Sequence, residues 1–350
     1  MFRLDRFLTL YFFHPLAKLS KPKGLRIPIL MYHSISDEPE TGHPYYWINT
    51  SPARFEEHMR FLSENGYTVI SLTDAVRLLS TNSTVSEGGS QESGVRSQEC
   101  STNETNSTNK TNITPLSDQP INQSTNPTNG TNETNSTNET NSTVSDLQPL
   151  NHSTTQPLNY VVITFDDGFR DFYTHAFPIL QKYGFTATIF LPTSFIEQER
   201  LMFKNKECLT WDEVRDLRRK GFSFGSHSVT HRQLKSLSND EVESELRRSK
   251  ERIEENIKES SESFAYPYRF PEEDKKFCDR LRGILEKCEY KFGVSTRIGT
   301  TDQNDDIFFL KRIPINSFDD IAFLKAKLNG GYDWLYRLQY LTKTLRSKVQ

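Results

Sequence analysis

The amino-acid sequence predicts an α/β fold, a distorted (β/α) barrel of about seven strands that is interrupted by one disordered low-complexity insertion. Short apolar and β-branched runs alternate with segments of helical periodicity along most of the chain. Between residues 160 and 191 a strand, a helix and a second strand follow one another, which is a βαβ unit and indicates a parallel sheet. Two of the expected strands end in carboxylates or histidines, and parallel barrels place their chemistry at such ends.

Residues 26–79 are expected to form the first part of the barrel. The apolar run at 27–32 is interpreted as its first strand, and it ends at His33. Ser51 followed by Pro52 is a typical helix start, and Gly66 is expected to end that helix. The expected elements are strands at 27–32 and 67–72 and helices at 51–66 and 73–79.

Residues 80–158 are expected to be a disordered insertion between a barrel helix and the next strand. Asn, Thr and Ser dominate this segment, and the octet Thr-Asn-Glu-Thr-Asn-Ser-Thr-Asn occurs at 102–109 and again at 131–138. Such a composition cannot bury enough apolar surface to offset the entropy of ordering the chain.

Residues 159–328 are expected to continue the barrel. Ser238 and Glu241 form a capping box for a long helix, and the charged outward face of that helix is interpreted as solvated. The expected strands are at 160–165, 186–191, 222–224, 264–266, 292–296 and 312–315, and the expected helices at 171–183, 211–220, 238–258, 274–289 and 319–328.

Two terminal segments, 1–25 and 329–350, flank the barrel. The apolar run at 7–13 follows Arg3 and Arg6, is too short to span a bilayer, and lacks a clear signal-peptide cleavage site. We therefore expect no cleaved signal, but a helix that lies on a membrane surface or on the barrel. The C-terminal segment is expected to be an amphipathic helix that packs on the core, with a membrane-surface helix as the alternative. Its apolar face holds Trp334, Leu338, Leu341 and Leu345.

The overall charge argues against a nucleic-acid partner, because the net charge is −3 and the pI about 6.3. The four cysteines show neither the spacing of a zinc ribbon nor that of a disulfide framework, so they are interpreted as free thiols. They do not decide the compartment; the cell envelope or the exterior is slightly favoured over the cytoplasm.

A pair of carboxylates follows the strand expected at 160–165, where Asp166 and Asp167 precede Gly168. Neighbouring side chains of a strand point in opposite directions, so one carboxylate can bind a cation while the other accepts a proton. The alternative is an ordinary turn, for which Asp-Gly is a common sequence.

Two histidines follow the strand expected at 222–224. His227 and His231 are four residues apart, a spacing that suits one metal ion if the segment is one helical turn. One carboxylate and two imidazoles leave coordination positions open for water and substrate, as in catalytic metal sites. The two strand ends together therefore indicate a divalent metal site.

In these motifs the chain resembles the polysaccharide deacetylases that share the NodB homology domain, a family also classed with carbohydrate esterase family 4. The matching residues are 164–168 (Thr-Phe-Asp-Asp-Gly), 227–231 (His-Ser-Val-Thr-His) and 264–268 (Phe-Ala-Tyr-Pro-Tyr). The resemblance extends to 28–33 and 55–72, and covers roughly residues 26–80 and 158–328.

The resemblance implies a metal-dependent hydrolase that removes N-acetyl groups from an oligo- or polysaccharide, with zinc as the expected metal. Asp167, His227 and His231 would bind the metal, and Asp166 would be the general base. The backbone N–H of Tyr268 would donate to the oxyanion, and Ser228 would orient the histidine turn.

Two positions depart from the family pattern. Ala265 stands where other members carry an arginine that pairs with the base, and Arg312 is the expected replacement. No histidine follows His231, so the family's proton donor is missing. The expected acid is His33, a protonated Asp166 or water; His33 could equally be a buried structural histidine.

Other functions stay open at this stage. A related metal-dependent amidase or an O-acetyl esterase would use the same activated water. A glycan-binding pseudoenzyme would keep the fold without catalysis, although the retained aspartates and histidines argue against it.

Overall fold

The computed structural model of the protein describes residues 3–19, 24–87 and 159–347. Residues 1–90 and 156–350 belong to one unit, and residues 91–155 form a second one, which lies outside the described residues. The disorder expected for the insertion therefore stays a prediction from residue 88 onward. Cys100 also lies outside the described residues, whereas the other three cysteines are buried free thiols.

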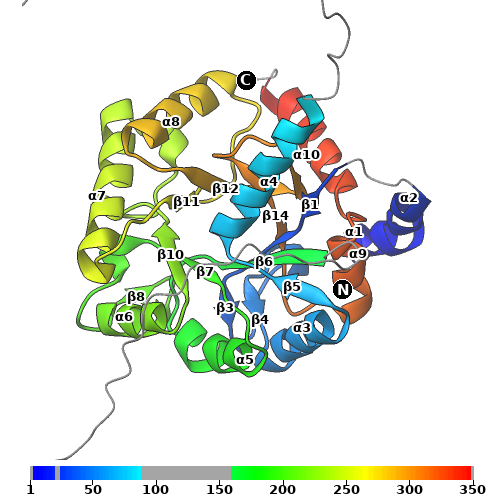
Figure 1. Ribbon diagram of the computed structural model, residues 1–350, viewed down its shortest axis with the longest axis horizontal. Coiled ribbons are helices and arrows are strands. Elements are labelled where there is room, and N and C mark those ends of the chain that lie inside the picture. Colours follow the sequence, from blue (N-terminus) through cyan, green and yellow to red (C-terminus); the bar gives the residue numbers. More distant parts are fainter. Residues whose placement is uncertain (1–2, 20–23, 88–158, 348–350) are drawn as a thin grey trace, which may run out of the picture. The chain divides into compact units, whose positions relative to one another are not determined.

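Within the described residues, seven parallel strands close into a barrel surrounded by helices (Figure 1). The ring closes because the first strand pairs with both the last strand and the strand that ends at Phe165. The expected fold class is thereby confirmed. In ring order the strands are β2 (Ile29–Tyr32), β14 (Leu310–Pro314), β12 (Phe292–Ile298), β11 (Ser263–Ala265), β10 (Ser223–Ser226), β7 (Thr188–Leu191) and β6 (Asn159–Phe165).

One expected strand lies beside the ring. β5 (Tyr67–Val69) pairs in parallel with β6 but with no second ring strand. Three short strand pairs outside the ring, all among the described residues, were not predicted from the sequence. Segments of only two residues show no periodicity by which they could be recognised. The pairs are β1 (Arg26–Ile27) with β13 (Thr301–Asp302), β3 (Ser34–Ile35) with β4 (Asn49–Thr50), and β8 (Met202–Phe203) with β9 (Lys206–Glu207).

Most barrel helices begin at capping residues that the sequence supplies. Ser51 accepts a hydrogen bond from the third residue of its helix, and full capping boxes form at Thr210 with Glu213 and at Ser238 with Glu241. The helices are α3 (Pro52–Glu64), α4 (Leu72–Glu87), α5 (Phe177–Lys182), α6 (Trp211–Arg219), α7 (Asn239–Ile257), α8 (Lys275–Lys287), α9 (Ile321–Leu328) and α10 (Trp334–Ser347).

Two helices differ from the prediction. α4 was expected to end at residue 79 but continues to Glu87, so the predicted end of this helix was wrong. The helix expected at 171–183 is a π-helical turn, Phe172–Ala176, followed by α5. Pro178 lies in the first turn of α5 and has no N–H to donate, which interrupts the regular hydrogen-bond ladder there.

The buried face of α7 carries polar and charged side chains. Glu245, Ser249 and Lys250 are buried along with Val242 and Leu246. Because residues three and four apart share a helix face, Glu245 necessarily lies beside these apolar residues. Glu245 thus lies on the buried face of this helix, not on the outward face that was interpreted as solvated.

The two termini pack against each other. Residues 4–19, which we call the N-terminal helical segment, comprise α1 (Leu4–Leu8), a π-helical turn (Thr9–Phe13) and α2 (His14–Leu19). The ring of Phe13 stacks on Trp334 of α10 at 4.5 Å between centroids. Leu338 and Leu341, expected on the packed face of α10, are instead about half exposed. Across the described residues, the helices are all too short or too polar to reach across a bilayer.

Candidate active site

The chemistry-bearing residues gather at one edge of the barrel. Asp166 and Asp167 directly follow β6, His227 follows β10, and His33 follows β2. All strands of the ring run in the same direction, so their carboxyl ends meet at that edge. Arg312 reaches the same edge from β14.

Three buried side chains form a candidate metal site. One ligand atom each from Asp167, His227 and His231 lies within 4.8 Å of the others. The Nε2 atoms of His231 and His227 are 3.2 and 3.8 Å from Asp167 Oδ1. That Oδ1 atom is buried and has no hydrogen-bond partner among the described residues. A buried carboxylate oxygen that has no hydrogen-bond partner and lies between two imidazoles is a suitable ligand for a divalent cation.

The backbone aims the carboxylate of Asp167. Asp167 has φ 71° and Gly168 φ 61°, so two successive residues are left-handed. A Cβ on Gly168 would approach the side chain of Leu191 to 3.0 Å, which explains why glycine follows the two aspartates. A non-glycine residue in this region is strained, and such strain gathers at functional sites.

The two histidines do not lie on a helical turn, and that part of the prediction was wrong. Residues 227–231 form an irregular turn in which Ser228 (φ 65°) and His231 (φ 56°) are left-handed. The turn is held from both sides. Ser228 Oγ accepts from the N–H of His231 at 3.0 Å. The Glu245 carboxylate accepts from the N–H groups of Val229 and Thr230 at 2.9 and 2.8 Å.

The tautomer of His227 is set by Ala265. His227 Nδ1 lies 2.8 Å from the carbonyl oxygen of Ala265, to which it donates, so Nε2 is left for the site. Burial lowers the pKa of His227 to about 3 despite the nearby Asp166. The ring is therefore neutral at physiological pH, which is the form that binds metals.

Asp166 is held by a two-point ion pair. Arg312 Nη1 donates to Asp166 Oδ1 and Nη2 to Oδ2, each at 2.7 Å, and both side chains are buried. Burial raises the pKa of Asp166, but the charge and hydrogen bonds of Arg312 outweigh this effect and lower the pKa to about 2. Arg312 thus contacts Asp166, as expected for a replacement of the arginine that is missing at Ala265.

His33 lies at the mouth of the site. Its Nε2 atom is 3.9 Å from Asp166 Oδ2, and its side chain is 20 % exposed. Burial lowers its pKa, although Asp166 and Asp167 oppose this. A neutral His33 can exchange protons with a group bound between it and Asp166.

Tyr268 forms part of the rim. It is left-handed (φ 59°), its ring centroid lies 4.6 Å from that of His231, and its side chain is about half exposed. Among the described residues its backbone N–H has no acceptor. This donor is therefore available to a bound oxygen.

Two contacts of the site were missed from the sequence. Lys204, at the tip of the β8–β9 hairpin, places Nζ 2.9 Å from Asp167 Oδ2 and over the ring of Phe203. Lys204 and Asn205 both have positive φ, as in a two-residue hairpin turn, but they lack the glycine that signals one. Glu245 was detectable in principle, since it shares the apolar face of its helix.

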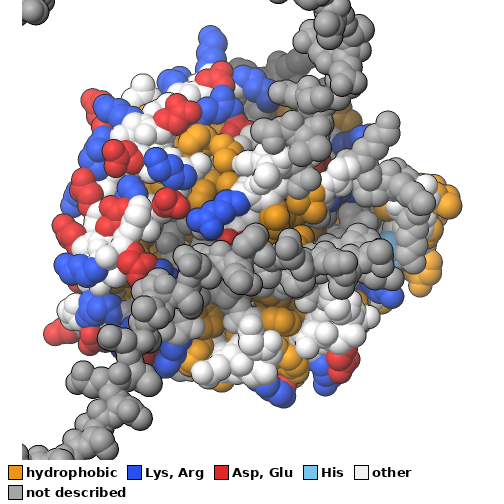
Figure 2. Space-filling view, in the orientation of Figure 1, with side chains coloured by type: hydrophobic (Ala, Val, Ile, Leu, Met, Phe, Trp, Pro, Cys, Tyr) orange, Lys and Arg blue, Asp and Glu red, His pale blue; other side chains and the backbone are white. Residues whose placement is uncertain are grey.

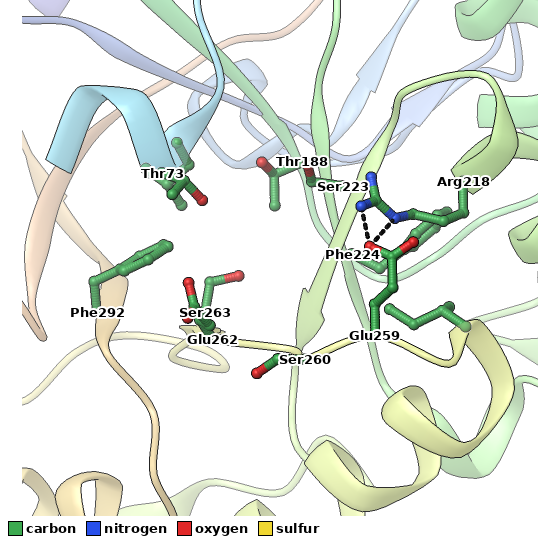
Figure 3. Close-up of a pocket in the computed structure, with 12 residues that line it drawn as sticks. Thr73, Thr188, Arg218, Ser223, Phe224, Glu259, Ser260, Glu262, Ser263 and Phe292 are labelled. Atoms are coloured by element: carbon green, nitrogen blue, oxygen red, sulfur yellow. Dashed lines mark hydrogen bonds and ion pairs between the residues drawn. The ribbon is translucent and has the colours of Figure 1, made fainter. Parts of the chain in front are cut away.

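A polar cavity of about 190 Å³ lies at the opposite edge of the barrel (Figure 3). Thr188, Ser223 and Ser263 line it from the first residues of β7, β10 and β11. Arg218 donates to Glu259 on one side of it, as the dashed lines show. No candidate site residue lines this cavity, so it is separate from the chemistry described above.

Comparisons with known proteins agree with this geometry. Residues 153–293 match the family model described as Polysaccharide deacetylase. The Bacillus subtilis protein named "Putative polysaccharide deacetylase YxkH" is 25% identical over 301 residues, 86% of this chain and 75% of that protein. The poly-beta-1,6-N-acetyl-D-glucosamine N-deacetylase of Staphylococcus aureus is 28% identical over 186 residues, 51% of this chain and 61% of that protein. The chain thus matches less than two thirds of the length of the second relative.

A solved structure supports the fold. The Streptococcus pyogenes deacetylase PplD, in complex with acetate, aligns with a TM-score of 0.56 at 22% identity, over 87% of this chain and 99% of that chain. At this identity the likeness concerns the barrel alone. The family model and the Bacillus subtilis relative confirm the resemblance, and residues 153–293 belong to the polysaccharide deacetylase family.

Proposed function

We propose that this protein is a metal-dependent hydrolase that removes N-acetyl groups from a glycan, with zinc as the metal. The observation that carries the proposal is the convergence of Asp167, His227 and His231 beside the Asp166–Arg312 pair. A buried carboxylate and two imidazoles suit zinc, and they leave positions for water and substrate. The relatives' names, which include an N-deacetylase of poly-N-acetylglucosamine, support a glycan substrate.

The reaction needs an activated water, a polarised acyl oxygen and a proton for the leaving amine. A bound divalent cation supplies acidity to water and polarises a carbonyl. Asp167, His227 and His231 would hold that cation. The carboxylate of Asp166, fixed by Arg312, would accept the proton of the attacking water. Tyr268 N–H would donate to the oxygen on which negative charge develops.

Breaking the C–N bond returns the proton to the amine and leaves acetate. Asp166 can return the proton it accepted, and His33, 3.9 Å from Asp166, can deliver it in its place. Because burial lowers the pKa of His33, its ring is neutral before the reaction, so it must first take up the proton that it delivers. By either route one amide and one water give one acetate and one protonated amine.

A related amidase or an O-acetyl esterase would use the same groups and differ in the bond that fits the site. A glycan-binding pseudoenzyme would not need a stoichiometric metal. The proposal favours N-deacetylation because of the names of the relatives.

The test is acetate release from a panel of N-acetylated and O-acetylated saccharides by the full chain, with and without a chelator. Asp166→Asn is the matched control, since it is nearly isosteric and cannot accept the proton. Chelator-sensitive release from N-acetylated members, lost in Asp166→Asn, supports the proposal. Release from O-acetylated members alone would make the protein an esterase, and glycan binding without any release would make it a pseudoenzyme.

A further inference from the structure

The N-terminal helical segment carries an exposed apolar ridge. Five of its large apolar side chains are between 53 and 83 % exposed, and their spacing follows the helical repeat, so they share one side. Soluble monomers rarely expose a contiguous apolar surface without a role in binding. The ridge consists of Leu4, Tyr11, Phe12, Leu16 and Leu19.

The opposite side of the segment is already packed on the protein. Phe13 stacks on Trp334, and Trp334 Nε1 donates to Thr9 Oγ1 at 3.0 Å. Nearer the N-terminus, Tyr332 Oη donates to Asp5 Oδ2 at 2.8 Å. The segment is therefore fixed in orientation, and its exposed ridge is not the side that packs on the barrel.

The charge of the chain is segregated toward its ends. Residues 1–26 hold six Lys and Arg and one acid, and residues 334–350 hold four Lys and Arg and no acid. These ends carry +9 in total, whereas the whole chain carries −3, which leaves −12 for residues 27–333. In Figure 2 both signs crowd the side around α7, while hydrophobic side chains gather at the edge where α2 lies. An anionic surface would attract the ends and repel the remainder.

We propose that the ridge binds the surface of an anionic lipid bilayer, with its side chains inserted at the boundary of headgroups and acyl chains. Leu16 and Leu19 are 58 and 83 % exposed, so they are free to insert into a fluid phase. Leucine, phenylalanine and tyrosine beside lysine and arginine are the composition of interfacial helices.

A cavity beside the ridge fits the same partner. It measures about 620 Å³, and its lining holds three arginines, each of which also pairs with a carboxylate of the protein. Guanidinium groups bind phosphate oxygens, and aromatic side chains line the same cavity. The lining consists of Arg3, Arg6, Arg54, Phe7, Tyr11, Ser317, Phe318 and Asp320.

Membrane binding would bring the catalytic edge close to the lipid surface. Arg6 pairs with Asp320 in the loop that follows β14, and the carboxyl end of β14 lies at the edge of the candidate active site. The ridge thus begins at that edge. This inference does not rest on the proposed deacetylase activity.

The test is cosedimentation of the full chain with vesicles of phosphatidylcholine alone or with added phosphatidylglycerol. Tyr11→Ser, Phe12→Ser and Leu16→Ser are combined in one variant, and Tyr46→Ser with Met202→Ser, exposed apolar residues elsewhere, form the matched control. We expect binding to the anionic vesicles only, weakened by salt, unchanged in the control, and reduced at least about tenfold in the triple variant.

Circular dichroism is measured on the same preparations, so that a misfolded variant is recognised. If the triple variant misfolds, the single variant Leu16→Ser replaces it, with a smaller expected loss of binding. The proposal is overturned if the wild-type chain ignores anionic vesicles, or if the folded variants bind as tightly as wild type. It is also overturned if, without lipid, the wild-type chain is a dimer that the variants dissociate, since the ridge would then bind a second copy.

Discussion

Arg312 and Asp166 form a buried two-point ion pair between residues 146 positions apart in the sequence. The arginine comes from β14 and the aspartate follows β6, and β2 lies between these two strands in the ring. Arg312 also donates from Nε to the carbonyl oxygen of Ser295 at 3.0 Å, which fixes the plane of the guanidinium. The orientation of the carboxylate of Asp166 is therefore set by Arg312, which is itself held by the backbone of β12.

Replacing Arg312 is expected to separate charge from geometry. Arg312→Lys keeps the positive charge but loses the two-point contact, so we expect kcat to fall by about 10 to 10²-fold with metal content unchanged. Arg312→Gln should also lower the free energy of unfolding by about 3–5 kcal/mol, because Asp166 is left buried and unpaired. Arg282→Lys, at the more exposed pair with Asp306, is the control for kcat and unfolding measurements. An unchanged kcat in Arg312→Lys would show that the orientation of Asp166 does not matter.

The metal site makes a prediction that does not depend on activity. His227→Ala and Asp167→Ala each remove one of three protein ligands, so stoichiometric zinc should be lost from both purified variants, along with acetate release. His175→Ala, an exposed histidine on the first helical turn after β6, is the control. Elemental analysis decides the matter. Full zinc content in both ligand variants would refute the assignment of the site.

The two candidate proton carriers can be ranked by their variants. Asp166→Asn should retain zinc and lose kcat by a factor on the order of 10² to 10⁴, the usual span for a general base. His33→Ala should cost far less if Asp166 itself returns the proton to the amine. If His33→Ala is equally damaging with zinc retained, His33 is the acid. If Asp166→Asn loses its zinc, the roles of Asp166 and Asp167 have been exchanged.

Glu245 is expected to support the metal site without touching it. Its carboxylate accepts from the backbone of Val229 and Thr230, so Glu245→Ala should loosen the histidine turn. Residues that orient ligands typically contribute 10- to 100-fold in metal affinity, and we expect about that loss in a zinc competition titration. Glu251→Ala, an exposed glutamate of the same helix, should leave the affinity unchanged. Equal affinities in the two variants would mean that the turn holds its shape without Glu245.

The stability of the protein is expected to fall with acid because of His58. This buried ring accepts from Tyr32 Oη at Nδ1 (3.0 Å) and lies 2.5 Å from the carbonyl oxygen of Asp319 at Nε2. Burial lowers the pKa of His58 from 6.5 to about 4. In the unfolded chain His58 is therefore protonated below about pH 6.5, whereas in the folded chain it is protonated only below about pH 4. The contribution of neutral His58 to the free energy of unfolding is fully present above pH 6.5. It declines toward pH 4, by at most on the order of 3 kcal/mol.

Urea unfolding of the metal-free protein between pH 4 and 7 measures this effect. His58→Gln should lower stability at neutral pH, through a lost hydrogen bond, and flatten the decline toward acid. His175→Gln, on the surface, should leave the slope as in wild type. Parallel curves for wild type and His58→Gln would show that another group causes the decline.

Much of this protein was determined by its sequence alone. Apolar runs of period two, helix caps such as Ser238 with Glu241, and glycine after Asp167 are local signals, and each acts within a few residues. They were sufficient for the strands, most helices and the strand-end motifs, because parallel strands bring their carboxyl ends to one edge whatever the details of packing.

The tertiary structure decided what depends on closure of the ring. The contacts of Arg312 with Asp166 and of Lys204 with Asp167 join segments that share no local pattern. The left-handed turn at His231 and its support by Glu245 depend on how α7 packs beside β10. Local patterns specify which backbone each segment adopts, but the partners of buried charges are selected only when the whole barrel excludes water around them.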